Sequence, residues 1–201
     1  MTEKYEVRAG YDEKSVRVYQ AFGEGIADGA LAAGRFVEPF RLTRMSWIKP
    51  SFNWMMYRSG FAEKHDQTRI LAIDLAREGF DWLIRNAVLS HFDPDLHATP
   101  EQWNESVRKS CVRVQWDPER DWKLDVVPTV RTIQLGLSGS ALHDYVNTWT
   151  VRITDVTSLA LQQKQAVNDG ALSAPDSPAL QERPYPVPGR ESEIRSSRPA
   201  F

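Results

Sequence analysis

Polar and apolar residues alternate along several segments of the chain, and this pattern predicts β-strands. Regular alternation, which is typical of a strand with one buried face, occurs at 15–20, 112–116 and 130–135. Residues 69–75 have an apolar centre and also indicate a strand. Residues 41–49 are strand-like, and Pro50 would end that strand because proline lacks a backbone N–H.

Helical signals lie between these strands. The alanine-rich stretch 26–36 predicts a helix that ends near Gly34, and Ser51 can cap a helix over 52–58 that Gly60 would end. Further helices are expected at 79–90, from Thr99-Pro100 onward, and over 140–167 with a break near 150–153.

Strands and helices are mixed without regular βαβ units, and neither the Walker pattern nor the GxGxxG fingerprint is present. These features favour an α+β fold: a single compact domain over residues 5–168, built around a mixed or antiparallel sheet. All seven tryptophans lie within this range.

The chain changes character near its C-terminus. Residues 170–201 are rich in proline, serine and charged residues, with few large apolar side chains to offset the entropy cost of ordering the backbone. We expect a Pro-rich disordered tail. It is either a dispensable extension or, through residues 184–188, a docking segment for a partner protein.

The composition of the chain limits which partners the protein can bind and where in the cell we expect it. The 25 Lys and Arg residues against 27 Asp and Glu give a formal net charge of -2, so any nucleic-acid contact must come from a local patch. The single cysteine, Cys111, excludes an internal disulfide. No apolar run approaches the ~20 residues that cross a bilayer, and the first residues lack the apolar core of a signal peptide. We expect a cytoplasmic protein with no membrane partner.

The segment 41–58 combines four cationic side chains with four aromatic ones, which are Arg41, Arg44, Lys49, Arg58, Trp47, Phe52, Trp54 and Tyr57. A cation beside an aromatic ring suits an anionic ligand with a flat ring, such as a nucleotide. The alternative is a buried strand and helix whose long cations reach solvent along their stems.

A second polar cluster, residues 115–120, ends the strand that begins at Val112 and contains Gln115 and Glu119. A carboxylate there could bind a sugar hydroxyl or stabilise a cation developing at the anomeric carbon. The alternative is a solvated turn at Asp117-Pro118. His91 and His97 do not meet a standard ligand spacing, so no metal is expected.

Several long strings resemble one family, the domain-of-unknown-function (DUF) 4291 proteins. They are VRVYQA at 16–21, RMSWIKPSF at 44–52, WMMYRSG at 54–60, VRVQWDPER at 112–120 and IQLGLSG at 133–139. The resemblance spans nearly the whole predicted domain, but it implies no activity.

A more distant resemblance is to the ADP-ribosyltransferase superfamily. Members have a first strand with His or Arg, then a helix ending in Gly, a strand running into a second helix, and a late catalytic Glu. A similar order occurs here, with Arg17 on the first strand, Gly34 after the first helix, Ser51 before the second helix, and Glu119 late. The fold implied is ADP-ribosyltransferase-like, and the implied cofactor is NAD, consumed as a substrate.

The same resemblance implies a role for each residue. Glu119 would be catalytic, holding the ribose and stabilising an oxocarbenium-like cation. The residues implied to bind the NAD molecule are Arg17 and Arg44 for pyrophosphate, Tyr19, Trp47 and Tyr57 for nicotinamide, Ser51 for ribose, and Lys49 and Gln115 in the same motifs.

Three functions are therefore compatible with the sequence. The first is an NAD-dependent ADP-ribosyltransferase-like enzyme acting on an unknown acceptor. The second is a non-catalytic protein that binds a nucleotide or nucleic acid through residues 41–58. The third is a structural or partner-binding protein whose aromatic residues form core.

Overall fold

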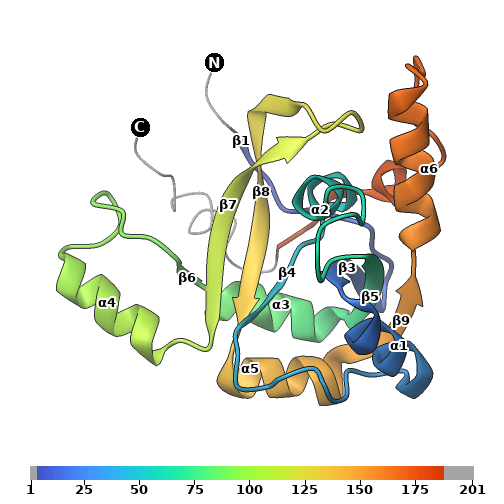
Figure 1. Cartoon of the computed structure of the whole chain (residues 1–201). Helices are drawn as coiled ribbons and strands as arrows, with labels where there is room; N and C mark the ends of the chain where they lie inside the picture. Colours follow the sequence, from blue (N-terminus) through green and yellow to red (C-terminus); the bar gives the residue numbers. More distant parts are fainter. Residues whose placement is uncertain (1–3, 188–201) are drawn as a thin grey trace.

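The computed structural model describes residues 4–187, and within them the chain forms an α+β domain around two main sheets (Figure 1). The larger sheet is mixed, with β8 at its centre, β7 and then β6 on one side, and β1 and β4 on the other side. Its strands are β1 (Lys4–Tyr5), β4 (Ser46–Ile48), β6 (Val88–Leu89), β7 (Val112–Arg120) and β8 (Val126–Leu137). The pairs β1–β8 and β6–β7 are parallel.

The second sheet is antiparallel, in the order β3-β5-β9. Its strands are β3 (Ser15–Phe22), β5 (Arg69–Ala76) and β9 (Thr150–Asp155). Tyr19 and Lys49 join the two sheets through an isolated bridge, with backbone N···O distances of 2.7 and 3.3 Å. A short ribbon, β2 (Arg8–Ala9) with β10 (Arg183–Pro184), completes the strands of the described residues.

Helices surround these sheets. They are α1 (Glu24–Ala33), α2 (Phe52–Ser59), α3 (Arg77–Asn86), α4 (Pro100–Lys109), α5 (Gly139–Asp144), the π-helix η1 (Tyr145–Trp149), α6 (Thr157–Asn168) and the 3-10 helix η2 (Pro178–Gln181). Figure 1 places α2 beside the β7–β8 hairpin, α6 at one side of the domain, and α4 at the other side beyond β6. None of the helices within residues 4–187 is long and apolar enough to span a bilayer.

Local sequence explains the helix ends. The Ser51 hydroxyl accepts a hydrogen bond from the Trp54 N–H and caps α2, and Gly60 ends this helix at φ 60°, a left-handed conformation that favours glycine. The Thr99 hydroxyl caps α4 in the same way, by accepting from the Gln102 N–H. These elements confirm the α+β fold around a mixed sheet predicted from the sequence.

The structure corrects four predicted elements. The helix predicted over 79–90 ends at Asn86, because Val88 and Leu89 pair with β7 as strand β6. The strand predicted over 112–116 continues to Arg120, because a bulge after Pro118 accommodates the proline within the pairing and the chain reverses only near residues 121–125. The strand predicted over 41–49 is limited to β4. The helix predicted over 140–167 is interrupted by a full strand, β9, and not by a simple break.

Residues 170–187, which the sequence assigns to the tail, are ordered against the domain up to Tyr185. The chain after Gly170 returns to the domain, where β10 pairs with β2 and the Tyr185 side chain is buried against Phe80 and Tyr11. One large aromatic residue and a backbone ladder offset the ordering cost that the Pro-rich composition suggested. The segment proposed to dock on a partner thus lies largely on its own domain, and residues 188–201 lie outside the described part of the chain.

Candidate functional site

A cleft with a volume of about 760 Å³ opens to solvent on the surface of the domain. Its walls are the end of β3, the start of α1, the loop before β4, β4 itself, and one face of α2. Pockets that bind small molecules typically measure roughly 300–1,000 Å³, so this cleft has the size of a ligand site.

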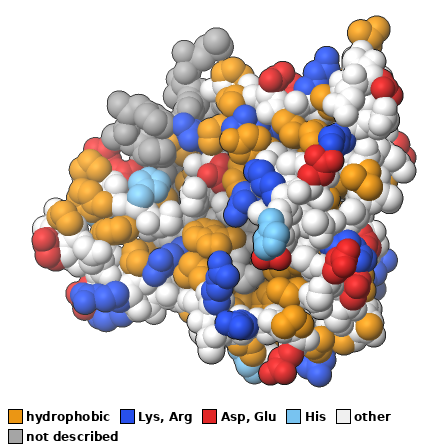
Figure 2. Space-filling model, in the orientation of Figure 1, with side chains coloured by type: hydrophobic (Ala, Val, Ile, Leu, Met, Phe, Trp, Pro, Cys, Tyr) orange, Lys and Arg blue, Asp and Glu red, His pale blue; other side chains and the backbone are white. Residues whose placement is uncertain are grey.

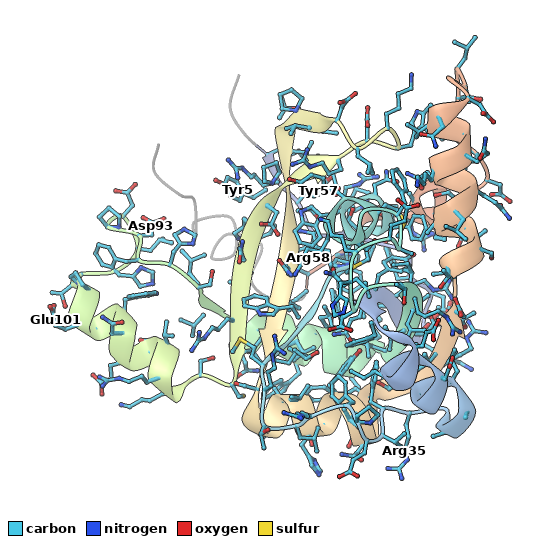
Figure 3. The ribbon with its side chains drawn as sticks, in the orientation of Figure 1. Tyr5, Arg35, Tyr57, Arg58, Asp93 and Glu101 are labelled. Carbon is cyan, nitrogen blue, oxygen red and sulfur yellow. The ribbon has the colours of Figure 1, made fainter. Side chains whose placement is uncertain are left out.

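Three arginines lie along this cleft: Arg41, Arg44 and Arg58. All three are exposed, and Arg58 donates to the Gln67 side chain at 3.1 Å. Neither Arg41 nor Arg44 pairs with a carboxylate among the residues that the structure describes. Figure 2 shows Lys and Arg side chains above and below a hydrophobic patch at the centre of this face, and Figure 3 places Arg58 near the centre of the same view.

Local geometry brings these arginines together. Residues 41–45 form a turn, not a strand, so Arg41 and Arg44 are not forced onto opposite faces and both line the cleft. Phe40 anchors this turn by packing against Phe36, with ring centroids 4.6 Å apart. Arg58 comes from α2, one helical turn after Trp54, which places both on one face of the helix.

Two tryptophans form the aromatic part of the cleft. The Trp47 ring lies over the backbone of Gly136, its partner on β8, so closely that a Cβ at position 136 would lie 2.9 Å from three ring carbons. The Trp54 ring also lines the cleft, and the Lys49 ammonium lies 4.0 Å from its centroid. The Gly136 backbone therefore holds the Trp47 ring in place, and the Lys49 ammonium holds the Trp54 ring.

The backbone of β4 is held by Gln20. Its side-chain amide donates to Ser46 Oγ at 2.8 Å and to the Trp47 carbonyl at 2.9 Å, and its carbonyl accepts from the buried Tyr145 hydroxyl at 2.7 Å. The cleft also contains two acidic residues, Glu24 and Asp66. Three guanidinium groups thus face two carboxylates, and the lining is cationic by one charge.

A buried ion pair lies behind Trp54. The Lys49 ammonium, which has no exposed surface, donates to the Asp117 carboxylate at 2.8 Å, and Gln115 donates to the other oxygen of this carboxylate at 2.9 Å. Burial lowers the pKa of Lys49 to about 8, and the Asp117 charge opposes this effect.

Two further carboxyl groups surround this pair. Glu119 accepts from the Ser51 hydroxyl at 2.7 Å and from the Arg120 N–H at 2.8 Å. Glu182 accepts from the Phe52 N–H at 2.7 Å, at the first turn of α2. Burial raises the pKa of Glu182 well above its ordinary value, and the neighbouring Glu119 adds to this. Asp117, Glu119 and Glu182 thus gather around one buried ammonium group.

The structure divides the predicted site residues into three groups and one exposed residue. Arg44 and Trp47 line the cleft. The buried network behind it contains Lys49, Ser51, Gln115 and Glu119. Arg17 and Tyr19 lie at a second, smaller cavity. Tyr57 is exposed, under the Arg120 guanidinium at 3.7 Å from its ring centroid.

Sequence reasoning missed several residues of these groups. Gln20 and Gln134 line the cleft but resemble ordinary members of alternating strands, so no local signal marks them. Glu182 falls within the predicted tail, and Asp74 and Arg152 lie on strands that give no hint of their pairing. Among residues 4–187, no group of three or more His, Cys, Asp or Glu side chains is arranged to hold a metal ion.

Fold and cleft together define a single α+β domain that carries a cationic, tryptophan-lined surface cleft backed by a buried ionic network. The chain belongs to the family described as domain of unknown function (DUF4291), which it matches over residues 6–185. This match includes the returning C-terminal segment up to Tyr185. Among curated proteins, none matches the chain.

Proposed function

We propose that the cleft binds an anionic ligand that carries a flat heterocyclic ring, which in chemical class is a nucleotide. The observation that carries this proposal is that Arg41, Arg44 and Arg58 share one open cleft with Trp47 and Trp54. A guanidinium group matches phosphate with two parallel hydrogen bonds, and an indole ring stacks on a base.

Both the arginine contacts and the tryptophan contacts favour ligand binding. Arginines without a carboxylate partner can bind phosphate without first breaking an ion pair, and Arg41 and Arg44 meet this condition within the described residues. Fixed indole rings lose little conformational entropy on binding. The formal net charge of -2 does not oppose this proposal, because recognition depends on the local field of the cleft.

The test is a ligand screen by thermal shift and calorimetry with ATP, NAD and a short single-stranded RNA. Arg44→Gln should weaken the binding of the ligand found by about tenfold, as expected for loss of a charge-assisted contact. The matched control is Arg35→Gln, because Arg35 is exposed, does not line the cleft and lies away from Arg58 in Figure 3.

The screen also separates the ligand classes. If RNA binds, its affinity should fall steeply with salt concentration, because phosphate contacts release counterions. If none of the three ligands binds, or if both variants lose affinity equally, the cleft is not a nucleotide site. A structural or partner-binding role for this face is then favoured.

A second candidate function is NAD-dependent ADP-ribosyl transfer to an acceptor. One observation favours it: the acid network that contains Glu119 and Ser51 lies directly behind the cleft, with Trp54 between the cleft and Lys49. Glu119 itself does not line the cleft, so a sugar could reach it only if the residues between them moved. The volume of the cleft and its arginine and tryptophan lining support a dinucleotide such as NAD as the substrate.

Glu119→Gln tests this candidate, with nicotinamide release as the measure of turnover. The change removes a charge while keeping the shape, so NAD binding should persist and turnover should disappear. Equal turnover in the variant and the native protein would exclude Glu119 as the catalytic group. Binding without turnover in the native protein would leave nucleotide binding as the function.

A further inference from the structure

A second cavity, of about 200 Å³, lies on the β3-β5-β9 sheet and shares no lining residue with the cleft among the described residues. Its floor is a row of charged side chains on three adjacent strands. Arg17 on β3 is directly opposite Asp74 on β5, and Asp74 is opposite Arg152 on β9. Because residues in register point to the same face, the three side chains meet.

The Asp74 carboxylate is the acceptor for both arginines. Arg17 donates to it from Nε at 2.7 Å and from Nη2 at 3.1 Å, and Arg152 donates from Nε at 2.8 Å. The Nη1 groups of both arginines make no hydrogen bond within residues 4–187. One carboxylate thus holds two guanidinium groups side by side and leaves N–H donors unused on each.

Tyr19 supplies the third polar group. It lies two residues after Arg17, on the same face of β3, and its side chain is fully buried while lining the cavity. Its hydroxyl has no hydrogen-bond partner among the described residues. A buried hydroxyl without a partner costs about 1–3 kcal/mol, so a ligand that supplied an acceptor to it would gain from this contact.

The cavity has a roof from two distant segments. Gly10 and Tyr11 cover one side, and Pro178 and Gln181 of η2 cover another. The segment that carries η2 is fixed by the Glu182 carboxyl group, which accepts from the Phe52 N–H, and by the β10–β2 ribbon. The site is therefore built by the fold and does not depend on one loop.

A second acidic residue, Asp12, also lines the cavity. The Asp12 carboxylate accepts from the Lys14 and Ser15 N–H groups at 2.8 and 2.7 Å and from the Ser15 hydroxyl. All three bonds go to Asp12 Oδ1, so this oxygen is directed to its own turn. The donors that the lining offers to a ligand include the Arg17 and Arg152 N–H groups and the Tyr19 O–H.

We propose that this cavity binds a small oxyanion, phosphate or a short carboxylate, between Arg17, Arg152 and the Tyr19 hydroxyl. The Arg152 side chain is 65% exposed, so a ligand would replace water at its donors. A ligand rich in acceptor oxygens suits these donors, and both anions meet this condition. The volume favours a small anion over a nucleotide, since pockets for drug-sized ligands typically measure roughly 300 Å³ or more.

The experiment titrates inorganic phosphate, and separately acetate, into the full chain at ionic strength held constant with sodium chloride, and follows thermal unfolding and the NMR signals of the Tyr19 ring. One or both anions should give a saturable rise in melting temperature with a shift of the Tyr19 signals. Tyr19→Phe should weaken this binding about fivefold, as for one hydrogen bond, and Arg152→Gln about tenfold.

Three controls separate this cavity from other anion sites. Tyr57→Phe is the matched exposed tyrosine, Arg35→Gln the matched exposed arginine, and Arg44→Gln reports on the cleft. These variants should leave the Tyr19 shift unchanged. Without anion, Tyr19→Phe should be at least as stable as the native protein, which also shows that the variant folds.

Two results would overturn the proposal. The first is the absence of saturable binding for both anions, in which case water is the partner of the Tyr19 hydroxyl. The second is binding that only Arg44→Gln weakens, which assigns the anion to the cleft. The first result leaves nucleotide binding untested, because the two sites have separate residues, whereas the second would support an anion site in the cleft.

Discussion

The ammonium group of Lys49 lies 2.8 Å from the Asp117 carboxylate, with no part of the lysine side chain in contact with solvent. Each charge therefore depends on the other for the stabilisation that water would otherwise supply. Lys49→Met should cost about 3–5 kcal/mol of unfolding free energy, because it leaves the Asp117 charge buried with only Gln115 as a partner. Urea unfolding measures this loss.

The same pair predicts a large coupling energy. Replacing both members, as in Lys49→Met with Asp117→Leu, should cost much less than the sum of the single changes. The control is Lys109→Met, which breaks the exposed helical pair of Lys109 with Glu105 and should cost less than about 0.5 kcal/mol. Additive effects at Lys49 and Asp117 would contradict the view that they form one unit.

Glu182 gives a prediction for pH. Burial raises its folded-state pKa well above the ordinary 4.5, so the folded protein binds a proton more tightly than the unfolded chain does. The stability from Glu182 is therefore fully present below pH 4.5 and is lost as the pH rises through the folded pKa. Glu182→Gln removes this loss while its side-chain carbonyl can still accept from the Phe52 N–H.

Unfolding free energies of the two proteins across this pH range supply the measurement. The difference between the variant and the native protein should shift in favour of the variant as the pH rises above 4.5. Carboxylates with lowered pKa values, such as Asp74 and Asp155, contribute with the opposite sign, but they are common to both proteins and cancel in the difference. A pH-independent difference would mean that Glu182 ionises normally.

A substitution at Gly136 tests whether the Trp47 ring contributes to ligand binding. A methyl group at this position would lie 2.9 Å from the Trp47 ring, so Gly136→Ala must displace the indole or the strand. We expect a loss of about 1–3 kcal/mol in stability and roughly tenfold weaker ligand binding, with a changed tryptophan fluorescence spectrum.

The matched control for Gly136→Ala is Gly34→Ala. Gly34 ends α1 at φ 66°, and no atom of a non-adjacent residue lies within 4 Å of the place that a methyl group would take, so alanine strains only the backbone there. It should cost about 1 kcal/mol and leave ligand affinity unchanged. If the two variants bind the ligand equally well, Trp47 does not contribute to ligand binding.

Tyr185 tests whether the returning C-terminal segment belongs to the domain. Its ring is buried beside Phe80, and its hydroxyl donates to Asp81 at 2.6 Å. Tyr185→Ala should cost about 3–5 kcal/mol, and Tyr185→Phe only about 1 kcal/mol, by chemical denaturation. A negligible cost for the alanine variant would restore the expectation of an independent tail.

Much of the fold could be predicted because its signals are local. Capping hydroxyls mark α2 and α4, terminating glycines mark α1 and α2, and period-two alternation marks β3 and β8. β9 was missed because residues 150–155 follow a helix and precede another, so their extended conformation depends on pairing with β5. The return of Tyr185 to the core is equally non-local, and composition alone pointed the other way.

In the candidate site, too, local features could be predicted from the sequence and long-range contacts could not. Arg44 and Trp47 are near in sequence and meet in the cleft, as the cationic and aromatic pattern suggested. Lys49 is only two residues beyond Trp47, yet it is buried, because its charge is matched by Asp117 on a distant strand. No property of the local sequence distinguishes a lysine that faces ligand from one that faces a buried carboxylate.

The contact of Trp47 with Gly136 links two positions that are far apart in the chain but adjacent across β4 and β8. Any side chain at the second position competes with the indole for the same space. Family members that have a larger residue in place of Gly136 should therefore also have replaced the tryptophan. Covariation at this pair would show which relatives keep an aromatic wall, and hence which can share a ligand, before any of them is purified.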